Sequence, residues 1–77
     1  MKATFKAPLN VIEAAVERAG LVSNPSGDKL GYDQNAVEIS FSKTVPGLIK
    51  VIGTPNGIMR LIGALADDGQ ECLKSVS

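Results

Sequence analysis

Few side chains in this sequence are suited to catalysis. The chain contains no histidine, and Cys72 is its only cysteine. Without histidine, no side chain titrates near neutral pH to serve as a general base or to activate a nucleophile. Cys72 continues the apolar spacing of the residues before it, so we expect a packed structural thiol; the alternative is a reactive thiol. The sequence therefore predicts a protein that is not an enzyme and that needs no cofactor.

Acidic residues gather near the C-terminus, where Asp67, Asp68 and Glu71 could form a metal or carboxylate-pair site. No EF-hand spacing surrounds them, and acidic residues near a helix end are ordinarily solvated surface. A zinc cluster is not expected either, because a lone cysteine has no histidine to join it. The sequence thus predicts no metal site.

A second short stretch, GTPNG at residues 53–57, has the composition of an anion-binding turn. It opens a predicted helix, and the free N–H groups at a helix N-terminus favour anions. Thr54, Asn56 and Gly57 are the candidate anion-binding residues. The stretch matches neither a Walker A loop nor the GxGxxG fingerprint, so an ordinary helix start is the main expectation.

The stretch from Leu48 to Leu65 (LIKVIGTPNGIMRLIGAL) organises the rest of the chain. LIKVI is apolar on both faces, which predicts a strand that is central or covered on its second face. Thr54 is expected to cap the next helix, with Pro55 at its first position. Apolar residues then recur at spacings of three and four, as on one side of a helix. We expect this helix to end near Ala66, with residues 70–75 a further turn or an extension of it.

The N-terminal residues predict a strand and then a helix. Residues 1–7 (MKATFKA) alternate between polar and apolar, and Pro8 ends the strand. Asn10 is expected to begin the helix, with Glu13 completing a capping-box-like pair. Gly20 follows the helix in a left-handed conformation. Leu21 and Val22 are expected to fold back onto the core.

Residues 23–35 (SNPSGDKLGYDQN) predict a long loop, a length that is often functional. Residues 36–43 (AVEISFSK) alternate again and predict a strand. VPGL at residues 45–48 fits a type II turn, which joins this strand to the next in an antiparallel hairpin. The chain of 77 residues is thus expected to form a single α+β domain. Its predicted order is β-α-β-β-α, a three-stranded mainly antiparallel sheet with both helices packed on one face.

The predicted sheet has one covered face and one open face. The helices are expected to cover Phe5, Val37, Ile39, Phe41, Ile49 and Val51. The open face is expected to carry Lys2, Thr4, Lys6, Glu38, Ser40, Ser42, Leu48, Lys50 and Ile52. Leu48 and Ile52 stand out there as aliphatic side chains. Scattered exposed aliphatics are normal, but we favour a face that is buried against another chain. The candidate partner-binding residues are Lys2, Lys6, Leu48, Lys50 and Ile52, with Tyr32 from the loop.

Composition sets the remaining expectations. Eight basic and eight acidic side chains cancel, so general attraction to nucleic acid is not expected. A chain this short buries only about 60–65% of its unfolded surface, which favours stabilisation as a homodimer. No signal peptide and no apolar run of membrane-spanning length occur, so we expect a cytoplasmic protein that does not enter a membrane.

These observations predict a non-enzymatic protein–protein interaction module that binds another protein and itself. Short, neutral chains without a catalytic set are typical of small accessory proteins of bacteria or phages, including inhibitors of host machinery. The alternative is a nucleic-acid-binding regulator that uses Lys2, Lys6 and Lys50 as a basic strip, although no aromatic residue is expected on that face to stack on bases. A third hypothesis is a sensor that binds a small anion at residues 54–57.

Overall fold

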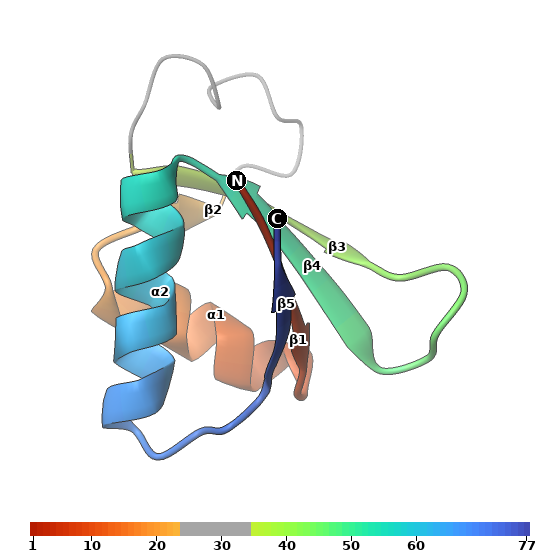
Figure 1. The fold of residues 1–77 in the computed structure, drawn as a ribbon. Helices are drawn as coiled ribbons and strands as arrows, with labels where there is room; N and C mark the ends of the chain where they lie inside the picture. Colours follow the sequence, from red (N-terminus) through yellow and green to blue (C-terminus); the bar gives the residue numbers. More distant parts are fainter. Residues whose placement is uncertain (24–34) are drawn as a thin grey trace.

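The computed structural model describes residues 1–23 and 35–77. Residues 24–34, which make up most of the loop predicted at residues 23–35 and include Tyr32, lie outside the described residues. The elements in chain order are β1 (Lys2–Lys6), α1 (Leu9–Arg18), β2 (Val22–Ser23), β3 (Ala36–Phe41), β4 (Leu48–Gly53), α2 (Pro55–Asp67) and β5 (Leu73–Val76). The strands form one sheet in the order β2-β3-β4-β1-β5, and both helices lie on the same side of it (Figure 1). The α+β class is confirmed, but the sheet is mixed and has five strands instead of three.

The stretch LIKVI is confirmed as a central strand. β4 lies between β3 and β1 and is antiparallel to both. Ile49 and Val51 are fully buried on its helix side. α2 follows directly, with Pro55 as its first residue and the Thr54 hydroxyl accepting a hydrogen bond from the Gly57 N–H at 3.1 Å. The core is thus built around a strand and a helix that the local sequence specifies.

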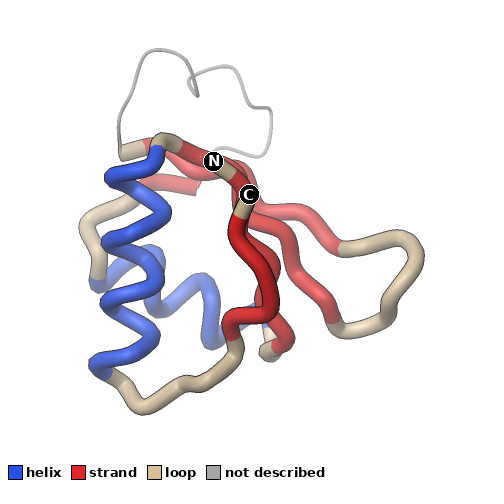
Figure 2. The backbone as a smooth tube through the Cα atoms, viewed as in Figure 1, coloured by secondary structure: helices blue, strands red, loops and turns tan. Residues whose placement is uncertain are grey.

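The β3–β4 hairpin turns at Gly47, whose φ of +80° is the left-handed conformation that the third position of a type II turn requires. The Leu48 N–H donates to the Val45 carbonyl at 3.3 Å and closes the turn. Figure 2 shows that the tip of the hairpin extends beyond the helices. Phe41 lies at the end of β3 and is 60% exposed. Its predicted place under the helices is therefore wrong, because the strand continues past the region that they cover.

The chain after α2 differs most from the prediction, because residues 73–76 form the edge strand β5 and not a helical extension. β5 pairs antiparallel with β1, with Phe5 opposite Leu73 and Thr4 opposite Ser75. The register shifts between Thr4 and Phe5, which leaves Lys74 as the extra residue of a β-bulge. The bulge places Leu73 and Val76 on the same sheet face. Their spacing of three therefore resembles that of a helix.

The segment from Pro8 to Ser23 also departs from the prediction in detail. α1 begins at Leu9, and its N-cap is Pro8 with no side-chain capping bond. The capping pair predicted from Asn10 is therefore wrong, since the Pro8 carbonyl already accepts bonds from the first turn. Gly20 has the expected left-handed φ of +73° and Leu21 is buried, but Val22 is 58% exposed and begins the two-residue strand β2. Ser23 is likewise part of that strand and not of a loop.

One hydrophobic core fills the space between the sheet and the helices. Its largest fully buried side chains are Phe5, Ile12, Ile49, Ile58, Leu61, Val37 and Val51. Arg18 joins the two helices outside this core, with its Nη2 3.7 Å from the Asp68 carboxylate and 3.4 Å from the Ala64 carbonyl. The core thus occupies the space beneath the two helices, and neither helix covers the opposite side of the sheet (Figure 1).

Candidate functional site

The strand register brings the predicted binding residues together on one surface. Lys2 lies opposite Ile52, Thr4 opposite Lys50, and Lys6 opposite Leu48 across the β1–β4 pair. Residues directly opposite each other in a sheet share a face, and side chains alternate between faces along a strand. Since Ala3, Phe5, Ile49 and Val51 are buried beneath the helices, these six residues project from the other side.

β3 extends this surface by two polar residues. Glu38 lies opposite Ile52, and Ser40 lies opposite Lys50. We call the surface formed by β1, β3 and β4 on this side the open sheet face. Its members are Lys2, Thr4, Lys6, Glu38, Ser40, Leu48, Lys50 and Ile52. Of the candidate partner-binding residues, only Tyr32 is not placed on it, because Tyr32 lies outside the described residues.

The open sheet face combines apolar area with positive charge. Leu48 and Ile52 are half-buried, while Lys2 and Lys6 are exposed. Thr4 at the centre of the face is only 8% exposed, so its neighbours screen it closely. Leu48 has Lys6 beside it and Ile52 has Lys2 beside it, while the Thr4–Lys50 pair lies between these two pairs. The face therefore presents aliphatic and basic side chains together on the side of the sheet opposite the helices.

Charge is divided between the two sides of the molecule. On the open sheet face, three lysines stand against Glu38 alone. On the helices and their C-terminal cap, four acidic residues stand against Arg18 and Arg60; these acids are Glu13, Glu17, Asp67 and Asp68. The formal net charge of zero therefore hides one basic and one acidic side among the described residues. The open sheet face therefore attracts anions more strongly than the net charge of the chain would suggest.

The candidate anion turn at residues 54–57 has few donors to offer. Pro55 has no N–H, the Gly57 N–H donates to the Thr54 hydroxyl, and the Ile58 N–H donates to the Thr54 carbonyl. In the first turn of α2, as the described part of the chain shows it, Asn56 alone keeps an N–H for a ligand. The turn therefore works mainly as a helix cap.

The acidic residues near the C-terminus do not converge. Asp68 pairs with Arg18 across the helices. Within residues 1–23 and 35–77, no group of three or more histidine, cysteine or acidic side chains is close enough to hold a metal ion. These residues therefore give no support to a metal or carboxylate-pair site.

Cys72 is a packed thiol at the start of the last strand. It is 5% exposed and belongs to the hydrophobic core. Burial raises the pKa of the Cys72 thiol, while a hydrogen bond to its own backbone and the charge of Lys74 act in the opposite direction. A raised pKa keeps the thiol protonated and reduces its nucleophilicity at neutral pH. The predicted structural role is consistent with this environment, although the predicted helical setting is wrong.

A second surface, which no sequence pattern indicated, is a groove between α1 and the β2–β3 edge. It is lined by Glu13, Val16, Glu17, Leu21, Val22, Ser23 and Ile39. Strand β2, which forms one wall of this groove, could not be recognised from the sequence because it has only two residues and pairs in parallel with β3. Glu13 and Glu17 lie one helical turn apart, which in the sequence resembles any solvated helix surface.

A comparison of the chain with models of known protein families, with curated proteins and with solved structures finds no match. Neither helix in the described residues is long and apolar enough to cross a membrane.

Proposed function

We propose that this protein is a non-enzymatic interaction module that binds a partner protein through the open sheet face. The observation that carries the proposal is the register that places Leu48 and Ile52 directly beside Lys6 and Lys2 on a surface that the helices do not cover. Protein interfaces typically combine a buried apolar centre with a polar rim that remains hydrated. Leu48 and Ile52 supply the apolar anchors, and the lysines supply the rim.

The charge of the open sheet face favours a partner with acidic side chains around an apolar patch. Complementary charge accelerates association and excludes partners of the same sign. A second copy of the chain fits this surface less well, because a two-fold contact would bring its lysines together. The predicted homodimer therefore stays a prediction, and we favour a different, acidic protein as the occupant.

A double substitution of the anchors tests the proposal. Leu48→Ser with Ile52→Ser removes both aliphatic side chains without introducing charge. Because a few buried anchors carry most of the energy of an interface, we expect partner affinity to fall about tenfold or more. The measurement is affinity capture from the source cells with nuclease treatment, followed by binding of the purified partner to each variant.

The matched control removes two exposed apolar side chains elsewhere. Val45 is 47% exposed on the hairpin and Met59 is 57% exposed on α2. The variant Val45→Ser with Met59→Ser should capture the partner as well as the unaltered chain does. Circular dichroism checks that both variants are folded. Equal capture by the anchor variant and by its control would rule out the open sheet face as the binding surface.

Nucleic acid is the second candidate, favoured by the concentration of Lys2, Lys6 and Lys50 on one side of a neutral chain. If these lysines bind phosphates, the logarithm of the affinity should fall with the logarithm of salt concentration with a slope of about −2 to −3. Lys2→Gln with Lys50→Gln should reduce that slope by about 2. Absence of binding to both DNA and RNA at low salt would exclude this function.

A further inference from the structure

The groove beside α1 is a second surface, on the opposite side of the sheet from the open sheet face. It has a volume of about 340 Å³ and lies between α1 and the edge of the sheet formed by β2 and β3. Val16, Leu21 and Ile39 supply apolar side chains from the helix, the following turn and the strand. Val22 is 58% exposed at the groove wall, and Phe41 is 60% exposed two residues beyond Ile39. Apolar side chains thus continue from the groove along β3.

The backbone of β3 is also incompletely paired along this groove. β2 pairs only with Ala36 and Val37, although β3 continues to Phe41. On the β2 side, no strand within residues 1–23 and 35–77 pairs with β3 beyond Val37. An unpaired strand edge presents N–H and C=O groups that can pair with another extended chain. The opposite edge of the sheet is less suitable, because β5 carries a bulge with Lys74 as its extra residue, and both features discourage further pairing.

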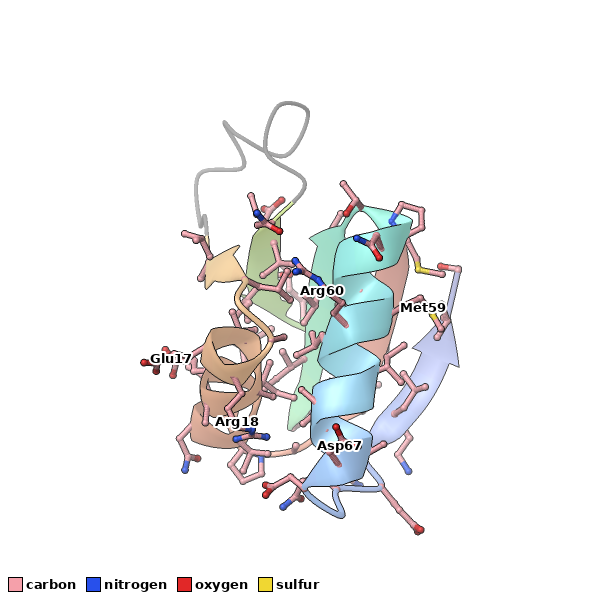
Figure 3. All side chains as sticks on the ribbon, turned by 90° about the vertical axis from the view of Figure 1, so that its left-hand side faces the viewer. Glu17, Arg18, Met59, Arg60 and Asp67 are labelled. Atoms are coloured by element: carbon pink, nitrogen blue, oxygen red, sulfur yellow. The ribbon has the colours of Figure 1, made fainter. Side chains whose placement is uncertain are left out.

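The rim of the groove is acidic. Glu13 and Glu17 are exposed on α1, and Figure 3 shows Glu17 pointing away from α2. Neither has a salt bridge in the part of the chain that the structure describes. The two arginines on the helices are engaged elsewhere, Arg18 with Asp68 at 3.7 Å and Arg60 with the Asn35 Oδ1 at 2.6 Å. A ligand for this groove would therefore contribute its own positive charge.

We propose that this groove binds an extended segment of a second protein in which basic side chains flank an aliphatic one, and that the segment adds a strand to β3. Strand addition derives its affinity from main-chain hydrogen bonds and its specificity from alternate side chains. The aliphatic side chain lies over Ile39, between α1 and Val22. Because Val37 already pairs with Ser23, the segment pairs with β3 only from Glu38 to Phe41 and leaves the sheet beside the end of β2. The basic side chain on the Phe41 side shares the face of the aliphatic one, and the flexible stems of both basic side chains extend toward Glu13 and Glu17. The protein then joins two partners of opposite charge on its two sides.

A peptide titration tests this groove with the full chain. The probe is the acetylated and amidated peptide TKTVTKT, which places one lysine on each side of a valine on a single strand face. Nuclear magnetic resonance of the ¹⁵N-labelled protein should show saturable shifts at Leu21–Ser23 and Ile39–Phe41. The charge-reversed peptide TETVTET should bind at least about tenfold more weakly, because it opposes acidic side chains to Glu13 and Glu17. A TKTVTKT probe with alternate backbone amides N-methylated should not bind, because it cannot form the added strand.

Two variants with the same change in net charge separate the rim from general electrostatics. Glu13→Gln with Glu17→Gln should weaken binding of TKTVTKT by about fivefold to tenfold at low salt, as expected for two exposed ion pairs. Asp67→Asn with Glu71→Gln removes two negative charges away from the groove and should leave the affinity within about twofold. Equal losses in both variants would show that only net charge matters and would overturn the proposal.

Other outcomes also overturn it. Absence of binding up to roughly 1 mM peptide excludes the groove as a useful site for this class of segment. Shifts of the same residues that depend on protein concentration without peptide would assign the groove to a second copy of the chain. This inference does not rest on the open sheet face: Leu48→Ser with Ile52→Ser leaves every groove residue in place, so each surface can fail independently.

Discussion

At the scale of single residues, Cys72 links the stability of the fold to alkaline pH. Burial raises the pKa of its thiol in the folded chain above the value of about 8.5 expected when unfolded. The contribution of the protonated thiol to stability is then complete below the unfolded pKa and is lost as pH rises through the folded pKa. We expect the free energy of unfolding to fall more steeply above pH about 8.5 in the unaltered chain than in Cys72→Ala. Urea titrations of both proteins across this range measure it; parallel curves would contradict the assignment.

Replacement of glycine by alanine is expected to change the stability of the fold in opposite directions at Gly53 and Gly63. A Cβ atom at Gly53 would meet the Val37 Cγ1 at 3.0 Å and the Ala36 carbonyl oxygen at 3.2 Å. Backbone cannot yield as a flexible side chain does, so we expect Gly53→Ala to destabilise the fold by about 1–3 kcal/mol. At Gly63 a Cβ atom would meet nothing within 4 Å, and Gly63→Ala should stabilise α2 by about 0.5–1 kcal/mol. Thermal unfolding measures both, and changes of the same sign would contradict the packing described for β4.

At the scale of elements, the pairing of β5 predicts which of two neighbouring positions tolerates proline. Lys2 and Ser77 exchange both backbone hydrogen bonds at 2.8 Å. In an antiparallel pair, hydrogen-bonded and non-hydrogen-bonded positions alternate, so the Ser75 N–H points to β1 and the Val76 N–H points away. We expect Ser75→Pro to cost about 1–3 kcal/mol through the lost bond and its unpaired acceptor, and Val76→Pro to cost clearly less. Chemical denaturation of both variants measures the difference; equal losses would contradict this register.

The elements that the sequence predicted correctly are those specified by their own residues. The β3–β4 hairpin depends on Gly47 in the turn, and α2 depends on Thr54 and Pro55 at its start. β5 was missed because the bulge at Lys74 changes the strand spacing of two to a helix-like spacing of three. The pairing that defines it is with β1, more than sixty residues earlier in the chain, and no local pattern reports such a pairing.

The residues of the candidate site also fall into those that local sequence predicts and those that it does not. Lys2, Lys6, Leu48, Lys50 and Ile52 were predicted to share a face, and the β1–β4 register brings them together because alternation within each strand fixes the face. Phe41 was misplaced because alternation gives the side of the sheet but not how far the covering helices extend. The groove could not be predicted, since it depends on the point at which β2 ends beside β3.

At the scale of the whole molecule, the separation of charge predicts behaviour that net charge does not. The smallest extent of the molecule is 21 Å, about twice the Debye length of roughly 10 Å at 0.1 M salt. The basic and acidic sides are therefore screened from each other and act independently on a charged surface. We expect this formally neutral chain to be retained on both cation and anion exchangers at pH 7 and moderate ionic strength.

Variants that remove charge from one side only distinguish retention by local charge from retention by net charge. Lys2→Gln with Lys50→Gln should abolish retention on the cation exchanger and leave elution from the anion exchanger nearly unchanged, because the helix side is unaltered. If net charge governed retention, the same variant would bind the anion exchanger more tightly. Glu13→Gln with Glu17→Gln should show the reverse selectivity. A chain that passes through both columns, or variants that change both elution positions together, would mean that the charges are too mixed to recruit two different partners.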